Sequence, residues 1–283
     1  MNVKILVDST ADIPEELIQK LNITVVPIYT LFGAESYRDG IDIDHETLYK
    51  RLLSGEQPTT SQSTPQDFIQ AYNLITPEAD GVCSIHISSE LSGTYSSAVQ
   101  AANQKPWPCP INVIDTHLLS ISHGIIAIKA ARLAKEGKSL EEISNAVEDM
   151  MKRVRLLVLF DTLKYLERGG RIGKAKSLVG SLLNVKPLLS MREGSFIPVG
   201  QVRNRKKGID KLAEFAEAAG DIEEMCILYS TTPDEAHSLA KRLNSIFPKE
   251  KTLVSRLGAG LAPHGGPGVL AIVTMTKKEP SEQ

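Results

Sequence analysis

Hydroxyl side chains crowd one ten-residue segment, Ser88–Ser97, which reads Ser-Ser-Glu-Leu-Ser-Gly-Thr-Tyr-Ser-Ser. An apolar run precedes this segment and a helical pattern follows it, which predicts a strand-to-helix junction. In open α/β folds such junctions receive anions and polar head groups, because the first N–H groups of the helix lack partners. Ser92 and Thr94 can either cap that helix or donate their hydroxyls to a ligand. The segment therefore predicts an anion-binding site.

Two further hydroxyl-rich turns lie at 8–12 and 59–64. All three turns follow predicted strands, so a parallel sheet would bring them to one edge. Thr60, Ser61 and Ser92 are then the candidate donors of neutral hydrogen bonds to a small anion. The alternative is that each turn only caps its helix, which is the commoner role of any single such turn.

A histidine, His264, stands within the glycine- and proline-rich segment 258–268. Such a segment turns tightly and lets a ligand approach the main chain. An equally good interpretation is a solvated or capping histidine. The basic run 203–207 begins a predicted helix, where the helix dipole disfavours positive charge. A bound anion would compensate Arg203, whereas the neighbouring lysines fit a solvated face.

Known catalytic motifs are incomplete. Ser92 and His264 could form a hydrolase or acyltransferase triad with Asp8 or Asp115, but Ser92 lacks the G-x-S-x-G elbow. The segment 167–174 has the wrong spacing for a phosphate-binding loop and better fits a Gly-Gly turn that ends a helix. No zinc or dinucleotide motif is present, so the sequence predicts neither a metal nor a cofactor.

Alternating strand and helix patterns must position these residues. Residues 1–153 predict a parallel sheet flanked by helices, with strands at 3–7, 23–32, 82–87 and 111–114 and helices at 14–21, 47–53, 66–74, 93–103, 119–135 and 140–153. Residues 154–283 predict a second α/β domain with a mixed sheet, with strands at 156–160, 185–191, 196–202, 225–229, 252–256 and 269–275 and helices at 162–167, 174–183, 206–219 and 233–243. The last residues, 277–283, predict a frayed tail.

Composition excludes several classes of protein. The 32 basic and 34 acidic residues among 283 leave a formal net charge of −2, which argues against nucleic-acid binding. The three cysteines form no C-x-x-C pair and fit reduced thiols in a reducing cytosol. No apolar stretch reaches the roughly 18 residues of a membrane span, and the first residues already predict a strand. A cytoplasmic protein without membrane insertion is expected.

Six short motifs occur in an order that resembles the DegV family of bacterial fatty-acid-binding proteins. They are Asp8–Asp12, Thr60–Gln62, Ser92–Tyr95, Gly169–Ile172, Lys186–Pro187 and His264–Gly268, and together they span nearly the whole chain. The resemblance implies a two-domain α/β structure with an acyl chain in a deep tunnel and its carboxylate at the domain junction. It also implies no catalysis by the chain itself: members called FakB present the fatty acid to a separate kinase subunit, which makes acyl phosphate for phospholipid synthesis.

The same resemblance implies roles for individual residues. Thr60 and Ser92 would bind the carboxylate directly, with His264 and an arginine of the Val-Arg-x-Arg segment completing the polar end. That arginine is Arg203 or Arg205; we take Arg203 as the carboxylate ligand and Arg205 as a residue that shapes the pocket. Ser61 and Gly93 would also shape it. The sequence departs from the family pattern at Ala262, where a glycine is usual. The direction in which the His264 side chain points therefore depends on the backbone of this loop.

Overall fold

The structure, a computed structural model, describes residues 1–178 and 185–278. Its first sheet has the strand order β2-β1-β6-β7, and all three pairings are parallel. The strands are β1 (Val3–Asp8), β2 (Thr24–Val26), β6 (Gly81–His86) and β7 (Ile111–Asp115). The predicted parallel sheet of the first half is thus confirmed.

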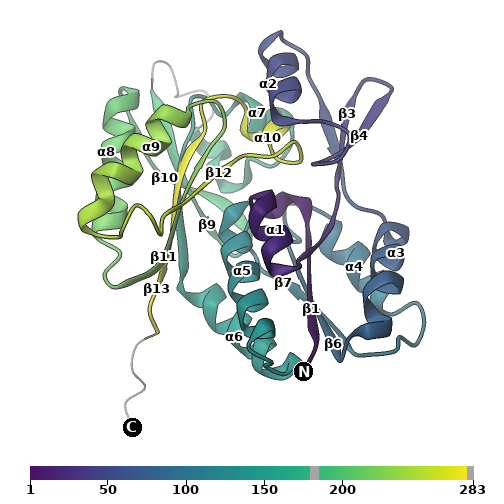
Figure 1. Ribbon diagram of the computed structural model, residues 1–283. Coiled ribbons are helices and arrows are strands. Elements are labelled where there is room, and N and C mark those ends of the chain that lie inside the picture. Colours follow the sequence, from purple (N-terminus) through teal and green to yellow (C-terminus); the bar gives the residue numbers. More distant parts are fainter. Residues whose placement is uncertain (179–184, 279–283) are drawn as a thin grey trace.

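Helices cover both faces of this sheet (Figure 1). Their bounds are α1 (Glu15–Leu21), α3 (Pro65–Ile75), α4 (Thr94–Ala102), α5 (Ile121–Lys135) and α6 (Leu140–Arg153). Leu6 and Val82 pack toward α3 and α4, whereas Ile5 and Ile85 pack toward α5 and α6. This alternation follows from the two-residue period of a strand and explains why both faces are apolar. Capping boxes begin α3 and α6, as Ser/Thr followed by an acid three residues later predicts.

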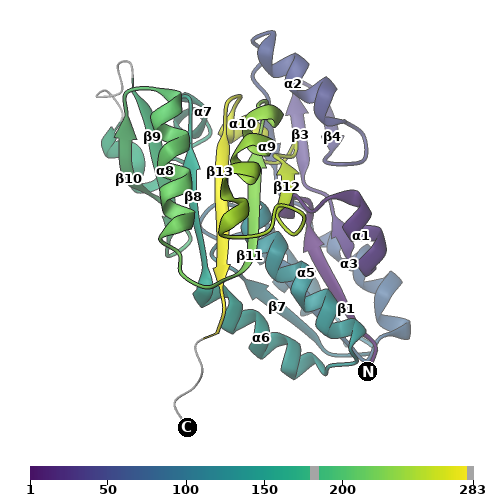
Figure 2. The same ribbon diagram turned by 60° about the vertical axis from the view of Figure 1, so that its left-hand side comes forward.

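The second sheet has the order β10-β9-β8-β13-β11-β12 and is mixed, with β11 and β12 parallel and its other pairs antiparallel. Its strands are β8 (Val154–Leu159), β9 (Lys186–Arg192), β10 (Ser195–Val202), β11 (Ile222–Tyr229), β12 (Leu253–Arg256) and β13 (Leu270–Thr276). Helices α8 (Arg205–Glu217) and α9 (Pro233–Arg242) cover its outer face (Figure 2). The mixed sheet of the second half is confirmed.

The inner face of the second sheet packs toward the first half, because one core cluster contains residues of β1, α5, β8, β11 and β13. The boundary between 153 and 154 stays a prediction; in the structure α6 ends at Arg153 and β8 begins at Val154. Within the described residues, no helix is long and apolar enough to cross a membrane.

A third, small sheet replaces part of one predicted strand. The single strand expected over 23–32 is wrong: β2 ends at Val26, and the chain enters β3 (Tyr29–Phe32) of another sheet after Pro27. Proline lacks the N–H that would continue the first ladder. The partners of β3 are β4 (Glu35–Arg38) and β5 (Thr59–Ser61), and α2 (His45–Leu53) follows β4. The expectation that the turn at 59–64 follows a strand of the parallel sheet is therefore wrong. Its first three residues form β5 of this third sheet.

Short helical turns complete the chain. They are α7 (Lys164–Arg168), α10 (Ala262–Gly265) and the 3-10 turns Ser9–Ala11, Thr76–Glu78, Gly173–Leu178 and Leu243–Ser245. The helix expected over 174–183 is a 3-10 turn as far as Leu178, and its remainder lies outside the described residues. Most of the expected tail at 277–283 also lies outside them.

Candidate binding site

A cavity of about 460 Å³ lies where the carboxyl ends of the first sheet meet the inner face of the second. Its walls come from segments that follow β1, β2, β6 and β7, from alternate residues of β8 and β13, and from Leu228 of β11. Most lining residues are apolar: Ile28, Ile87, Leu91, Leu119, Ile121, Leu156, Val158, Phe160, Leu166, Phe196, Leu228, Leu257, Leu261, Val269, Ala271 and Val273. The volume lies within the roughly 300–1,000 Å³ typical of small-molecule sites.

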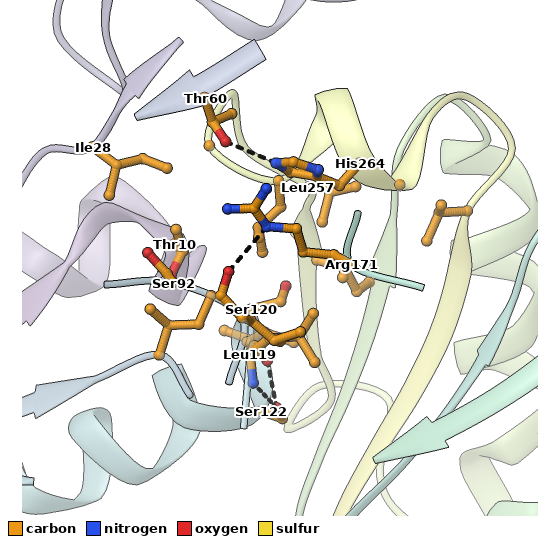
Figure 3. Close-up of a pocket in the computed structure, with 18 of the residues that line it drawn as sticks. Thr10, Ile28, Thr60, Ser92, Leu119, Ser120, Ser122, Arg171, Leu257 and His264 are labelled. Carbon is orange, nitrogen blue, oxygen red and sulfur yellow. Dashed lines mark hydrogen bonds between the residues drawn. The ribbon is translucent and has the colours of Figure 1, made fainter. Parts of the chain in front are cut away.

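Thr60 and His264 meet at the polar part of the lining (Figure 3). The Thr60 Oγ1 atom lies 2.7 Å from His264 Nε2 in a half-buried hydrogen bond that joins residues 204 positions apart. β5 carries the threonine, and the single helical turn α10 carries the histidine. The sequence predicted both residues for one site, and the structure brings them together.

The imidazole of His264 is neutral at neutral pH. Burial, together with the positive charges of Arg171 and Arg168, lowers its pKa to about 4. Its Nδ1 atom has no hydrogen-bond partner within the described part of the chain. A neutral imidazole holds one ring N–H, so His264 can donate from one nitrogen and accept at the other.

Ser92 lines the cavity at the junction that follows β6. Its Oγ lies 2.8 Å from Thr94 Oγ1 and accepts a weak hydrogen bond from the Thr94 N–H at 3.3 Å. Gly93 is tightly enclosed, because a Cβ there would lie 2.0 Å from the Gln62 side-chain oxygen. Ser61 and Gln62 line the cavity from β5 and the residue after it. The same cavity is thus lined by Thr60, Ser61, Ser92 and His264. Gly93 does not line it but packs against the side chain of Gln62, which does.

The cation at this cavity is Arg171, which the sequence did not assign to the site. It follows the Gly-Gly turn after α7; its Nε donates to the Leu91 carbonyl at 3.1 Å and its Nη1 to the Gly169 carbonyl at 2.7 Å. Figure 3 shows its guanidinium group among Thr60, Ser92 and His264. These two bonds leave Nη2 without a partner among the described residues. Arg171 belongs to the motif Gly169–Ile172, which the resemblance to the family included. Taken alone, the Gly-Gly turn indicated only the end of a helix, so the sequence did not assign Arg171 to the site.

Arg203 and Arg205 do not line the cavity, which corrects the sequence-based placement of the cation. Arg203 is exposed at the end of β10. Arg205 forms ion pairs with Asp161 at 3.1 Å and Glu235 at 2.5 Å and donates to the Gly268 carbonyl. These carboxylates provide the compensating negative charge at the start of α8. The guanidinium of Arg205 therefore cross-links the second half instead of facing the ligand space.

The residues of the alternative catalytic triad, Ser92, His264 and Asp8 or Asp115, are not hydrogen-bonded to one another among the described residues. No hydrogen bond joins Ser92 to His264 among the described residues, because Ser92 pairs with Thr94 and His264 with Thr60. The proposed acids are engaged elsewhere: Asp8 with His86 at 3.0 Å, and Asp115 with the His117 N–H at 2.9 Å. A serine nucleophile needs a base within hydrogen-bond reach and an acid that orients the base.

The first hydroxyl turn, at 8–12, serves mainly to hold the histidine segment. The Asp12 carboxylate accepts the Gly258 N–H at 2.9 Å, and Asp39 accepts the Ala259 N–H at 3.0 Å. Burial raises the pKa of Asp12 well above its usual value despite the hydrogen bond from Ser120. Of this turn only Thr10 lines the cavity. The two acids therefore fix the backbone that leads into α10.

Hydroxyls deeper in the cavity are already satisfied. Ser120 donates to Asp12, and Ser122 donates to the Leu119 carbonyl. Because their hydrogen-bonding needs are met internally, they do not compete with an apolar ligand. At the Thr60–His264 end, by contrast, Nη2 of Arg171 has no partner within the part of the chain that the structure describes. The arrangement suits an amphiphilic anion with a long apolar part.

Comparisons with known proteins identify the family of this chain. The family model described as "Uncharacterised protein, DegV family" matches residues 2–277. Protein DegV of Bacillus subtilis is 34% identical over 277 residues, covering 96% of this chain and 98% of that protein. A DegV domain-containing protein of Caldanaerobacter subterraneus is 35% identical over 273 residues, covering 95% and 97%.

Solved structures give the same result. A fatty-acid-binding DegV family protein from Thermus thermophilus superimposes with a TM-score of 0.91 at 35% identity, covering 98% of this chain and 100% of that one. DegV of B. subtilis, a fatty acid binding protein, gives 0.89 at 34% identity with the same coverage. A stearic-acid-binding protein from Eubacterium ventriosum gives 0.87 at 25% identity, covering 96% and 98%. By sequence over nearly its full length and by fold, this chain belongs to the DegV family.

Proposed function

We propose that this protein binds one long-chain fatty acid, with the acyl chain in the apolar cavity and the carboxylate at Thr60, Ser92, His264 and Arg171. The observation that carries the proposal is the concentration of hydroxyl groups, one imidazole and one guanidinium at one end of an otherwise apolar cavity. A carboxylate removed from water requires several donors and a nearby cation. The fatty acids bound by the Thermus and Bacillus relatives support the same ligand class.

The acyl chain supplies most of the affinity. Burial of each methylene group is worth about 0.8 kcal/mol, whereas one hydrogen bond contributes about 1 kcal/mol net. A chain of about sixteen carbons therefore gains on the order of 10 kcal/mol before the costs of binding. The polar end orients the ligand, and the tunnel holds it.

The carboxylate would remain within reach of a second protein. Ser61 and Arg171 line the cavity and are both exposed, so the polar end lies near the surface. We therefore propose that the protein performs no catalysis itself and presents the carboxylate in the cytoplasm to a fatty-acid kinase subunit, which forms the acyl phosphate. The unassembled triad around Ser92 supports this division of labour over a hydrolase or acyltransferase.

Ligand identity is tested by solvent extraction and mass spectrometry of protein purified from a bacterial host, followed by delipidation and reloading. One fatty acid per chain is expected. Protein that neither carries nor accepts a fatty acid would overturn the proposal.

Presentation is tested with the double variant Thr60→Ala, Ser92→Ala in a reconstituted assay with a fatty-acid kinase and ATP. The variant should still bind the fatty acid through its tail but form acyl phosphate more slowly. Unchanged phosphorylation would contradict the assigned roles of both hydroxyls. Hydrolysis of acyl esters by the isolated wild-type protein would favour the catalytic alternative.

A further inference from the structure

The cavity ends at the same depth on two neighbouring strands of the second sheet, β8 and β13, and one step earlier on β11. On β13 and the residue before it, the lining residues are Val269, Ala271 and Val273. On β8 and the residue after it, they are Phe160, Val158 and Leu156. Register pairs Ala271 with Val158 and Val273 with Leu156, so the two series descend together from the α10 end. Val273 and Leu156 form the deepest pair that borders the cavity.

The next pair on the same face lies one step beyond the last lining pair. Met275 pairs with Val154, and both belong to the same core cluster as Val273 and Leu156. Their exposures are 0% and 3%, yet neither lines the cavity. On the adjacent strand β11, Leu228 lines the cavity, whereas Cys226 is buried beside Val273 without lining it.

Side chains two residues apart on a strand stand on the same face, roughly 6.5 Å from each other. Met275 therefore occupies the volume one step beyond the present end of the cavity. Below it, α6 contacts β13 and contributes Val147 and Met150 to the same cluster. Methionine is unbranched and fills irregular space, so its truncation opens room that its packed neighbours do not automatically refill.

We infer that Met275, seated against Val154, is the floor of the acyl tunnel and sets the longest fatty acid that this protein accepts. The inference rests on the proposed function, since it assigns a specificity-determining residue to that cavity. Met275→Ala removes three heavy atoms, which makes room for about two to three further methylene groups. Each newly buried methylene changes the Kd by about fourfold.

A matched control lies on the opposite face of the same sheet. Met225 has 0% exposure and sits beside β13, but it faces the outer core under α8 and α9. Met225→Ala makes an equally buried methionine-to-alanine change without contact with the tunnel. Any effect of cavity formation on stability alone should appear in both variants.

The experiment loads delipidated wild type, Met275→Ala and Met225→Ala with an equimolar mixture of saturated fatty acids from C12 to C24 and measures the bound species by mass spectrometry. Met275→Ala should shift the distribution upward by about two carbons, while Met225→Ala keeps the wild-type distribution. A second variant, Val273→Leu, should shift it downward because it fills the deepest lining position. Circular dichroism establishes that each variant is folded.

The outcomes separate the two proposals. If wild type binds no fatty acid, the proposed function fails. If wild type binds a fatty acid but neither Met275→Ala nor Val273→Leu changes the distribution, only the floor assignment is overturned. An equal shift in Met225→Ala also overturns it, because the effect would then not come from the tunnel.

Discussion

A Cβ atom on Gly169 would lie 2.1 Å from Nδ1 of His264. Gly169 has φ −76° and ψ −6°, a conformation open to any residue, so backbone strain does not explain the glycine. The close approach of the imidazole does. The turn after α7 therefore sets the position of the histidine that bonds Thr60.

Gly169→Ala should displace His264 and weaken its hydrogen bond to Thr60. Loss of one oriented hydrogen bond lowers fatty-acid affinity by about tenfold, measured by displacement of a fluorescent fatty acid. Gly200→Ala is the control, because nothing lies within 4 Å of a Cβ at Gly200. Equal affinities for the two variants would show that Gly169 does not position the histidine.

Arg171→Gln should weaken binding of a fatty acid by about tenfold or more, since a charged hydrogen bond to the carboxylate is lost. Binding of the corresponding fatty-acid methyl ester, measured by calorimetry, should change little. Arg203→Gln serves as the matched control, because Arg203 is exposed and does not line the cavity. A larger loss of fatty-acid affinity in Arg203→Gln than in Arg171→Gln would contradict this prediction and favour Arg203 as the carboxylate ligand.

His123 is completely buried, and neither ring nitrogen has a partner among the described residues. Burial lowers its pKa to about 4, despite the opposing charge of Asp8. The unfolded chain binds a proton near pH 6.5 that the folded chain resists, so stability falls as the pH drops from 7 toward 4.

For this group alone the loss between pH 7 and pH 5 is about 2 kcal/mol of unfolding free energy. His123→Leu should remove that loss and relieve the unpaired polar atoms, so that it stabilises the protein more at pH 5 than at pH 7. Urea denaturation at both pH values measures the difference. An identical change at the two pH values would contradict the assignment.

Asp39 has the opposite pH dependence. Burial raises its pKa to about 6, although hydrogen bonds from Ser9, Gly260 and Ala259 oppose the shift. The folded state then binds a proton more readily than the unfolded state. Its contribution is fully present below about pH 3.8 and is lost as the pH rises through 6.

Between pH 5 and pH 8 this group should reduce the unfolding free energy by about 1 kcal/mol. Asp39→Asn keeps an oxygen that can accept the Ala259 N–H but removes the charge. The unfolding free energy of the variant should therefore increase relative to that of the wild type as the pH rises. Glu250→Gln, at an exposed position, is the control. A constant difference between Asp39→Asn and wild type from pH 5 to pH 8 would refute this prediction.

Much of the fold followed from local pattern. Apolar runs such as 82–87, the capping pairs Thr64/Asp67 and Ser139/Glu142, and glycine after a helix mark elements whose ends depend on nearby residues. The prediction of one strand over 23–32 was wrong, because the apolar pattern continues through Pro27 whereas the hydrogen-bonded ladder ends before it.

By itself the sequence determined the order of elements, the family, and the candidates Thr60, Ser92 and His264. Residue types and local spacing carry that information. Only the tertiary structure decided that Arg171 and not Arg203 lies at the cavity, since the choice depends on how the turn after α7 packs against α10. It also decided that Val273 borders the cavity while Met275 closes it. A tunnel wall and a packed core use the same apolar side chains, so the end of the empty space depends on packing between distant strands.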